Sequence, residues 1–442
     1  MKILILISAI VIGLYGCRSR HVVLDERELP ALWADLTLLI TKNTPANSPT
    51  FASRAFGYIG LAMYESVVHG DSNARSLGGQ LNGLPLLPLP EQNKTYHWPL
   101  CLNAAEAAIL RDIYIQTSHA NKQKIDSLEK AVYESFSNAL TDPGVAERSA
   151  AYGKALAEVI FEWSKTDGGH RGYLSNFDPR MSYPYGPGRW RPPFYAQQIS
   201  RFPLHPHWGG NRTFLVADTG WKMPAFIEHN SDSVSESFRA FIKVYEANKK
   251  ITQEQKEIAL WWNDDPSETF TPPGHSYNLG SAVVRIKKPT LREGAETYAR
   301  IGLAVADAFM ICWKIKYHFF SERPSTFVNQ FRDDSWNPFW PDPPFPSFPS
   351  GHATQAGAVA TVLAGLYGDS LTFTDSSHAG RPMDKERKVA YKPRTFHSFW
   401  QVAEETAYSR FLGGIHSDQD NIVGLREGSS VGKNINALKW KN

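Results

Sequence analysis

The sequence predicts an all-α fold of two packed helical bundles joined by an irregular middle segment. Over most of the chain, apolar residues recur at intervals of three and four, which is the period of an amphipathic helix, whereas strand-like alternation is rare. The helical period disappears from Thr166 to Pro224, where proline, glycine and aromatic residues are too frequent for a helix. These observations place helices on both sides of an ordered, non-helical segment.

The composition is that of a folded protein. Of the 442 residues, 42% are apolar and 21% are charged, and 47 Lys and Arg against 44 Asp and Glu give a net charge of +3. These values exclude a mainly disordered chain and a nucleic-acid binder held by bulk positive charge. Three cysteines are too few for a disulfide scaffold, and the sequence leaves open whether Cys101 and Cys312 pair.

The first residues resemble a bacterial targeting segment. Met1-Lys2 is a basic start, and the apolar run 3–15 is about thirteen residues long, too short to span a bilayer of ~30 Å as a helix. The sequence Leu14-Tyr15-Gly16-Cys17 resembles a lipoprotein cleavage box. We therefore expect a signal peptide at 1–16 and a lipid on Cys17 that anchors the chain outside the cytoplasm, at a bacterial outer membrane. A secretory signal without a lipid, cut nearby, is the alternative.

Helical periodicity defines five segments before the irregular stretch and three after it. They are 31–40, 51–68, 104–115, 122–140 and 145–163, then 234–247, 253–262 and 293–321. We expect an N-terminal bundle with the irregular segment over 17–230 and a C-terminal bundle over 231–442. The aromatic stretch from Tyr183 to Trp208 is a candidate wall of a substrate funnel.

The first cluster of candidate site residues lies at the end of the last of these segments. Lys316 and Arg323 are seven residues apart, about two helical turns, so we expect both cations on one helix face near the C-terminal end. Pro324 is expected to end that helix. Taken alone, two cations at this spacing are more often a solvated surface.

The second cluster is Ser350-Gly351-His352, which precedes a run of small residues from Ala353 to Gly365. Ser350 is well placed to cap a helix, and Gly351 lets the backbone approach a ligand closely. The free N–H groups at a helix start attract anions. A simple helix cap is the alternative interpretation of this cluster.

The third cluster contains Arg410, His416 and Asp420. Arg410 falls late on a helix that begins near Ser398, and Gly413-Gly414 ends this helix, so that His416 can turn back toward Arg410. Asp420 is four residues beyond His416, on the same face if a new helix begins there. A carboxylate in that position fixes the imidazole tautomer.

Together the clusters supply three cations, neutral donors and two titratable histidines. Such a set suits a tetrahedral or trigonal-bipyramidal oxyanion such as phosphate or vanadate. The combined pattern K-x6-RP … PSGH … SR-x5-H-x3-D resembles the three-part signature of the type 2 phosphatidic acid phosphatase superfamily. This superfamily includes acid phosphatases and vanadium-dependent haloperoxidases. The segments 262–265, 313–316 and 343–354 are more similar to the haloperoxidase branch.

The resemblance implies two packed four-helix bundles of the vanadium haloperoxidase and acid phosphatase type, with vanadate as cofactor. His416 would bind vanadium through Nε2, His352 would act as general acid–base, and Lys316 would also polarise hydrogen peroxide. The residues implied to bind the vanadate oxygens are Lys316, Arg323, Ser350, Gly351 and Arg410.

Supporting roles follow from the same resemblance. Asp265, with Asp264 as the competing choice, would pair with Arg410, and Asp420 would orient His416. Phe345 occupies a position that differs among haloperoxidases, but it does not settle the halide.

The implied reaction is the oxidation of a halide, iodide or bromide in the first place, by hydrogen peroxide to hypohalous acid, with a small organic compound as an optional acceptor. In the alternative, a phosphomonoesterase, His416 forms a phospho-histidine and His352 protonates the leaving group. A glycan-binding lipoprotein would explain the anchor and the aromatic residues, but not the three motifs. The sequence leaves the oligomeric state open.

Overall fold

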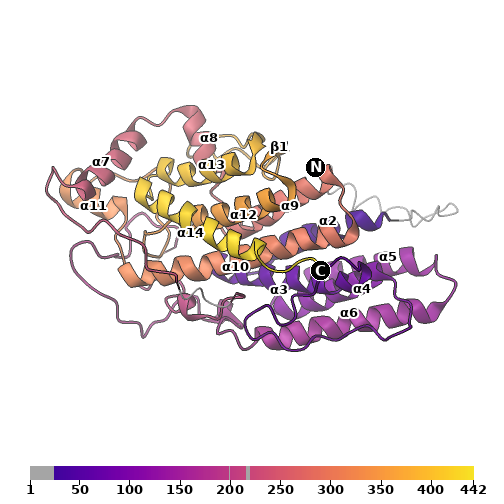
Figure 1. Cartoon of the computed structure of the whole chain (residues 1–442). Coiled ribbons are helices and arrows are strands. Elements are labelled where there is room, and N and C mark those ends of the chain that lie inside the picture. The colour runs from indigo at the N-terminus through magenta and orange to yellow at the C-terminus, as the bar shows by residue number, and fades with distance from the viewer. Residues whose placement is uncertain (1–23, 199, 216–219) are drawn as a thin grey trace.

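The structure is a computed structural model that describes residues 24–198, 200–215 and 220–442 (Figure 1). The first series of α-helices is α2 (Leu29–Asn43), α3 (Pro49–Glu65), α4 (Trp98–Ile113), α5 (His119–Ser137) and α6 (Pro143–Ser164). The second is α7 (Glu236–Lys249), α8 (Gln253–Trp261), α9 (Thr271–Lys287), α10 (Leu291–Phe319), α11 (Pro324–Phe331), α12 (Gly351–Tyr367), α13 (Phe399–Leu412) and α14 (Asp418–Asn436). Between α12 and α13, β1 (Ser370–Asp375) pairs antiparallel with β2 (Arg394–Ser398).

This architecture confirms the all-α prediction and adds elements that periodicity did not show, among them the β1–β2 hairpin and helix α9. The hairpin of β1 and β2 is short, and one face of it is exposed. Helix α9 begins with Thr271-Pro272-Pro273, and its apolar residues are buried on several sides rather than along one stripe. An amphipathic pattern therefore does not mark α9.

Helix α10 runs through the middle of the molecule (Figure 1). One side of it packs along α3, and the other packs against α12 and α14. It begins with a capping box in which Thr290 Oγ1 accepts from the Glu293 N–H and the Glu293 side chain accepts from the Thr290 N–H. The 29 residues of α10 carry the chain from the first bundle to the candidate site, because Lys316 lies in its last turn.

The structure corrects the expected placement of the first two cations. Helix α10 ends at Phe319, and Phe320 has a left-handed backbone with φ of 50°. Arg323 therefore lies beyond α10, and Pro324 opens α11 at its first position instead of ending α10. Lys316 and Arg323 do not share a helix face, and the turn between the two helices brings them together.

The irregular segment is fastened to the second half of the chain by main-chain hydrogen bonds. The Trp190 N–H donates to the Phe320 carbonyl at 2.9 Å, and the Leu204 N–H donates to the Pro344 carbonyl at 2.7 Å. Near its end, the buried Asp307 carboxylate on α10 accepts from the Phe214 N–H at 2.7 Å. The segment is therefore an ordered cover beside the candidate site.

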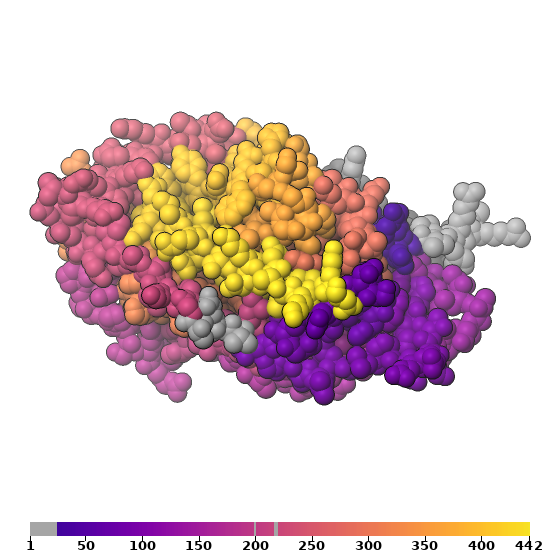
Figure 2. Space-filling view, viewed as in Figure 1, coloured from indigo at the N-terminus to yellow at the C-terminus, as the bar shows by residue number. Residues whose placement is uncertain are grey.

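The C-terminal end of the chain returns to the first bundle, where yellow atoms meet indigo and purple ones in Figure 2. The Arg75 N–H donates to the Trp440 carbonyl at 3.0 Å. Cys101 and Cys312 are both buried and free. None of the helices in the described ranges combines the length and apolar character that a membrane crossing requires. Cys17 lies outside the described residues.

The close crossing of α3 and α10 gives a test of the fold. A Cβ at Gly302 would overlap the Phe56 carbonyl oxygen, which belongs to a helix backbone and cannot move aside. We expect Gly302→Ala to lower the free energy of unfolding by about 1–3 kcal/mol, because overpacking outweighs the ~1 kcal/mol that alanine gains in helix propensity. Urea denaturation of both proteins measures the difference.

Gly351→Ala is the matched control, since a Cβ there lies 3.6 Å from the Trp313 ring, an ordinary contact. Equal stability of the Gly302→Ala variant and the wild type would contradict the close packing of the two helices.

Candidate functional site

A cavity of about 280 Å³ lies where several helix ends of the second half converge. The predicted site residues that line it are Asp265, Phe345, Gly351, His352, Arg410 and His416. Lys316, Arg323, Ser350 and Asp420 are buried next to them. The structure thus brings together residues from all three sequence clusters.

Lys316 is fully buried and points at main-chain carbonyls. Its Nζ donates to the carbonyl oxygens of Pro346, Ser347 and Pro349 at 2.9, 2.6 and 2.5 Å, which uses all three hydrogens of an ammonium group. Burial, with Arg323 nearby, lowers the pKa of Lys316 to about 7. A bound anion would stabilise the ammonium form and raise this pKa.

Arg323 is fully buried between two loops. Its guanidinium donates to the Phe345 carbonyl at 2.9 Å and to the Ile415 carbonyl at 2.9 Å, and one nitrogen lies 3.1 Å from His416 Nε2. Because a guanidinium can only donate, the Nε2 atom of His416 accepts in this contact. Burial lowers the pKa of Arg323 to about 10, so it stays charged at neutral pH.

The start of α12 presents N–H groups to the cavity. Ser350 is the N-cap residue, and its Oγ accepts from the Ala353 N–H at 3.3 Å. Neither a positive φ nor a crowded neighbour requires glycine at position 351. The missing side chain of Gly351 instead leaves space in the cavity beside the positive end of the helix.

His352 lies in the first turn of α12, with its Nε2 buried and without a hydrogen-bond partner among the described residues. Burial and the neighbouring Arg410 hold the pKa of His352 well below its usual value. The imidazole is therefore neutral at pH 7 and has a free nitrogen for proton transfer.

Arg410 lies in the last turns of α13 and donates to the Trp262 carbonyl at 3.0 Å. Its Nε is buried and has no partner within the described part of the chain.

Of the two aspartates considered as partners of Arg410, Asp264 has both carboxylate oxygens engaged by histidines, whereas Asp265 accepts from Gln197 Nε2 at 3.1 Å. Burial raises the pKa of Asp265 to about 6, and the Arg410 charge opposes this rise. Asp265 remains the carboxylate that we propose for Arg410.

His416 is held by a carboxylate behind it. Its Nδ1 lies 3.0 Å from Asp420 Oδ2, which also accepts from Ser347 Oγ at 2.7 Å and from the Ser417 N–H at 3.0 Å. Helix α14 begins at Asp418, so His416 and Asp420 lie one turn apart. A hydrogen on Nδ1 leaves Nε2 with a lone pair, which accepts from Arg323 here and could bind an electrophile instead.

Aromatic rings close the wall of the cavity. Phe345 packs against Trp313 with ring centroids 5.0 Å apart, and its face lies 5.2 Å from Lys316 Nζ. Trp313 is buried and also lines the cavity, so its ring belongs both to the core and to the cavity wall. From the irregular segment, Gln197 and Leu204 line the cavity, whereas Tyr183 and Trp190 pack behind it on Phe320.

This donor set fits a tetrahedral oxyanion. Three cations are buried within one region, and none of them forms a direct ion pair with a carboxylate of the described ranges. Two buried nitrogens, His352 Nε2 and Arg410 Nε, have no partner among the described residues. An anion with several oxygens would satisfy these groups and neutralise the cations.

Some of the residues that build the site carry no sequence signal. Ser347, which holds Asp420, lies among prolines and phenylalanines in a loop. Gln197 comes from the irregular segment, 68 residues before its partner Asp265. His275 and His378, which engage Asp264, are 11 and 114 residues away from it. Spacing cannot reveal contacts that only the tertiary fold creates.

The helical bundles and the cation-lined cavity define an oxyanion-binding protein of the all-α class. Residues 327–439 match the family model of the VCPO second helical-bundle domain. The chain is 23% identical to vanadium chloroperoxidase of Curvularia inaequalis over an alignment of 476 positions, gaps included. The alignment covers 85% of this chain and 75% of that protein.

Solved structures extend this similarity to nearly the whole chain. The crystal structure of the first bacterial vanadium-dependent iodoperoxidase superposes with a TM-score of 0.78 at 31% identity, over 92% of this chain and 95% of that chain. The chain belongs to the vanadium-dependent haloperoxidase family. A holo-type bacterial vanadium-dependent chloroperoxidase shares the fold, with a TM-score of 0.64 at 16% identity over 89% of this chain and 92% of that chain.

The contact between His416 and Asp420 predicts the effect of a substitution. Asp420→Asn keeps the side-chain volume but removes the negative charge that fixes the Nδ1 hydrogen. We expect vanadate affinity to fall about 10- to 100-fold, as for other carboxylates that orient a metal-binding histidine. Equilibrium dialysis with quantification of bound vanadium measures this.

Asp418→Asn is the matched control, because Asp418 lies at the same helix start but pairs with the exposed Lys243. The assigned role of Asp420 is wrong if both variants bind vanadate as tightly as the wild type.

Proposed function

We propose that the chain binds vanadate and oxidises a halide, iodide or bromide in the first place, with hydrogen peroxide to hypohalous acid. The observation that carries this proposal is the group of buried cations, Lys316, Arg323 and Arg410, beside the unprotonated Nε2 of His416, whose one hydrogen-bond contact among the described residues is with Arg323. Membership of the vanadium-dependent haloperoxidase family supports the peroxidase chemistry.

The proposed vanadate-binding groups fall into two sets. Lys316, Arg323 and Arg410 provide positive charge, and Ser350 and the Gly351 N–H provide neutral donors at the start of α12. Bound vanadate would supply a Lewis acid that accepts peroxide oxygen and makes it electrophilic toward halide. The residues of the chain therefore have to bind the vanadate anion and transfer protons to and from the reacting oxygens.

His416 supplies the one protein atom proposed to bond to vanadium. Asp420 keeps the hydrogen on Nδ1, and burial among the cations holds the pKa of His416 well below its usual value. The Nε2 lone pair is therefore available at neutral pH. When vanadate is absent, Arg323 donates to this lone pair at 3.1 Å. On vanadate binding, Arg323 would give up this contact with His416 and donate to a vanadate oxygen instead.

His352 and Lys316 are the proposed proton-handling groups. The neutral His352 can take a proton from hydrogen peroxide at its free Nε2 and return it to a leaving oxygen. Lys316 can stabilise negative charge on a peroxide oxygen. Its ammonium group donates to three main-chain carbonyls, and it could donate to an anion in place of one of them.

The choice of halide rests on similarity. The solved structure at 31% identity is an iodoperoxidase, which favours iodide for this chain as well. Phe345, whose ring lies over Lys316, does not separate the halides. We also propose that a small organic acceptor can enter the cavity of about 280 Å³. Lipid attachment at Cys17 and an extracytoplasmic location remain predictions from the sequence.

An activity assay tests the function. Purified protein is incubated with orthovanadate and hydrogen peroxide. Triiodide formation is followed with iodide, and halogenation of monochlorodimedone is followed with bromide and with chloride. We expect vanadate-dependent turnover. His416→Ala should abolish this turnover, whereas His352→Ala should bind vanadate but turn over about 10²- to 10⁴-fold more slowly, because it lacks the proton-transfer group.

His119→Ala is the control, since His119 is exposed at the start of α5, far along the chain from the site motifs. Hydrolysis of p-nitrophenyl phosphate without vanadate, together with no halide oxidation, would contradict the proposal and favour the phosphatase alternative.

A further inference from the structure

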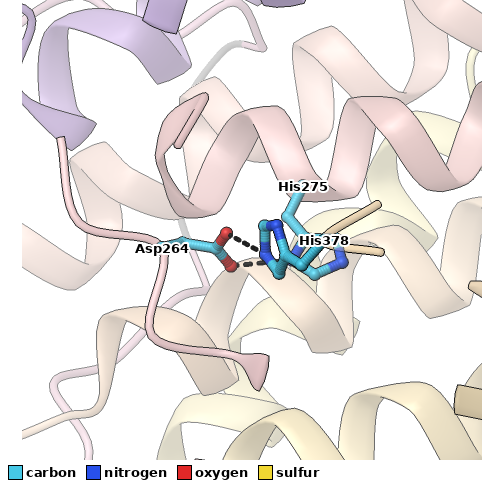
Figure 3. Close-up of side chains that lie close together, drawn as sticks. All are labelled: Asp264, His275 and His378. Carbon is cyan, nitrogen blue, oxygen red and sulfur yellow. Dashed lines mark hydrogen bonds and ion pairs between the residues drawn. The ribbon is translucent and has the colours of Figure 1, made fainter. Parts of the chain in front are cut away.

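Asp264, His275 and His378 form a buried cluster beside the oxyanion cavity (Figure 3). Asp264 lies in the turn after α8, His275 near the start of α9, and His378 in the loop after β1. Each side chain is at most 2% exposed. Asp264 also lines the oxyanion cavity, but its two carboxylate oxygens are engaged by the histidines, so the cluster needs its own explanation.

The three side chains converge through atoms that commonly bind metals. Asp264 Oδ2 lies 2.7 Å from His275 Nδ1, and Asp264 Oδ1 lies 2.9 Å from His378 Nε2. One ligand atom from each residue lies within 4.8 Å of the others. Small shifts of these side chains would place all three atoms around one ion at bonding distance, which is about 2.0–2.2 Å for zinc with nitrogen and oxygen ligands.

A second carboxylate holds the other nitrogen of His275. Its Nε2 lies 2.7 Å from Asp375 Oδ2, and this carboxylate also accepts from Trp261 Nε1 at 2.7 Å and from the Ser377 N–H at 2.9 Å. Metal-binding histidines characteristically donate their second N–H to a fixed carboxylate in this way. Asp375 would therefore accept from Nε2 of His275 and so orient Nδ1 of the same ring toward a bound ion.

The charges in the cluster favour a cation. Both nitrogens of His275 face carboxylate oxygens, so both carry hydrogens when no ion is bound, and two carboxylates with one imidazolium leave one net negative charge in a buried place. Of the cations nearby, Arg381 pairs with Glu268 at 3.2 Å and Arg410 donates to the Trp262 carbonyl at 3.0 Å, and neither forms an ion pair with Asp264 or Asp375. A divalent ion with a neutral His275 would bring the cluster to zero charge.

We propose that Asp264, His275 and His378 bind one divalent transition-metal ion, zinc in the first place. Two imidazoles and a carboxylate are a ligand set that zinc accepts readily. The ion would fasten the turn after α8 to α9 and to the loop after β1. This turn also carries the Trp262 carbonyl that accepts from Arg410, so the ion would position the turn beside the oxyanion cavity. The proposal does not depend on vanadate binding.

Metal analysis of untagged protein tests the proposal. We expect about one zinc per chain after dialysis against zinc and removal of the excess, independent of vanadium content. Cobalt in place of zinc should give a visible absorption band that the metal-free protein lacks. His378→Gln should lose the bound metal and the absorption, and Asp375→Asn should weaken binding about 10- to 100-fold. His397→Gln, an exposed histidine on the adjacent strand β2, should bind as the wild type does.

The proposal is overturned if the wild type binds no zinc, cobalt or manganese, or if His378→Gln keeps the full metal content. The first result would show that the cluster is a hydrogen-bonded Asp–His–Asp relay without a metal. Should His378→Gln fail to fold by circular dichroism, anomalous diffraction from zinc-soaked crystals of the wild type decides. A peak between Asp264 and the two histidines supports the site, and its absence refutes it.

Discussion

Lys316, Arg323 and Arg410 are buried around one cavity without a carboxylate in direct contact among the described residues. A buried cation without a partner costs free energy, because water no longer solvates it. The chain offsets part of this cost with main-chain carbonyl groups, which belong to Trp262, Phe345, Pro346, Ser347, Pro349 and Ile415. Carbonyl dipoles do not cancel the net positive charge, so a bound anion would stabilise all three cations at once.

The fold around the cavity follows from this constraint. Carbonyl groups inside a helix already accept hydrogen bonds from the helix backbone. The loops before α12 and between α13 and α14 therefore supply carbonyl groups that can accept from the cations. Lys316 and Arg410 lie in the last turns of α10 and α13, where helix dipoles favour cations, whereas α12 points its positive end at the cavity. The turn after α8 contributes the Trp262 carbonyl, and the cluster around Asp264 fastens this turn from behind.

The sequence predicted the helical class and most helices, because amphipathic periodicity is a local property. It also identified residues that the structure brings together, such as Arg323, His416 and Asp420, because short motifs repeat across a family. It misplaced Arg323 relative to α10, since the left-handed backbone at Phe320 has no glycine to mark it. Contacts such as His275 with Asp375, 100 residues apart, depend on tertiary packing that no local pattern records.

The central claim is that the buried cations bind vanadate and that His416 Nε2 bonds to the vanadium. X-ray absorption at the vanadium edge, recorded on the vanadate-loaded protein and on His416→Ala, tests it most directly. We expect oxygen ligands plus one nitrogen ligand in the wild type, and the loss of the nitrogen ligand in the variant. Vanadium surrounded by oxygen alone in the wild type, or the same spectrum in both proteins, would contradict it.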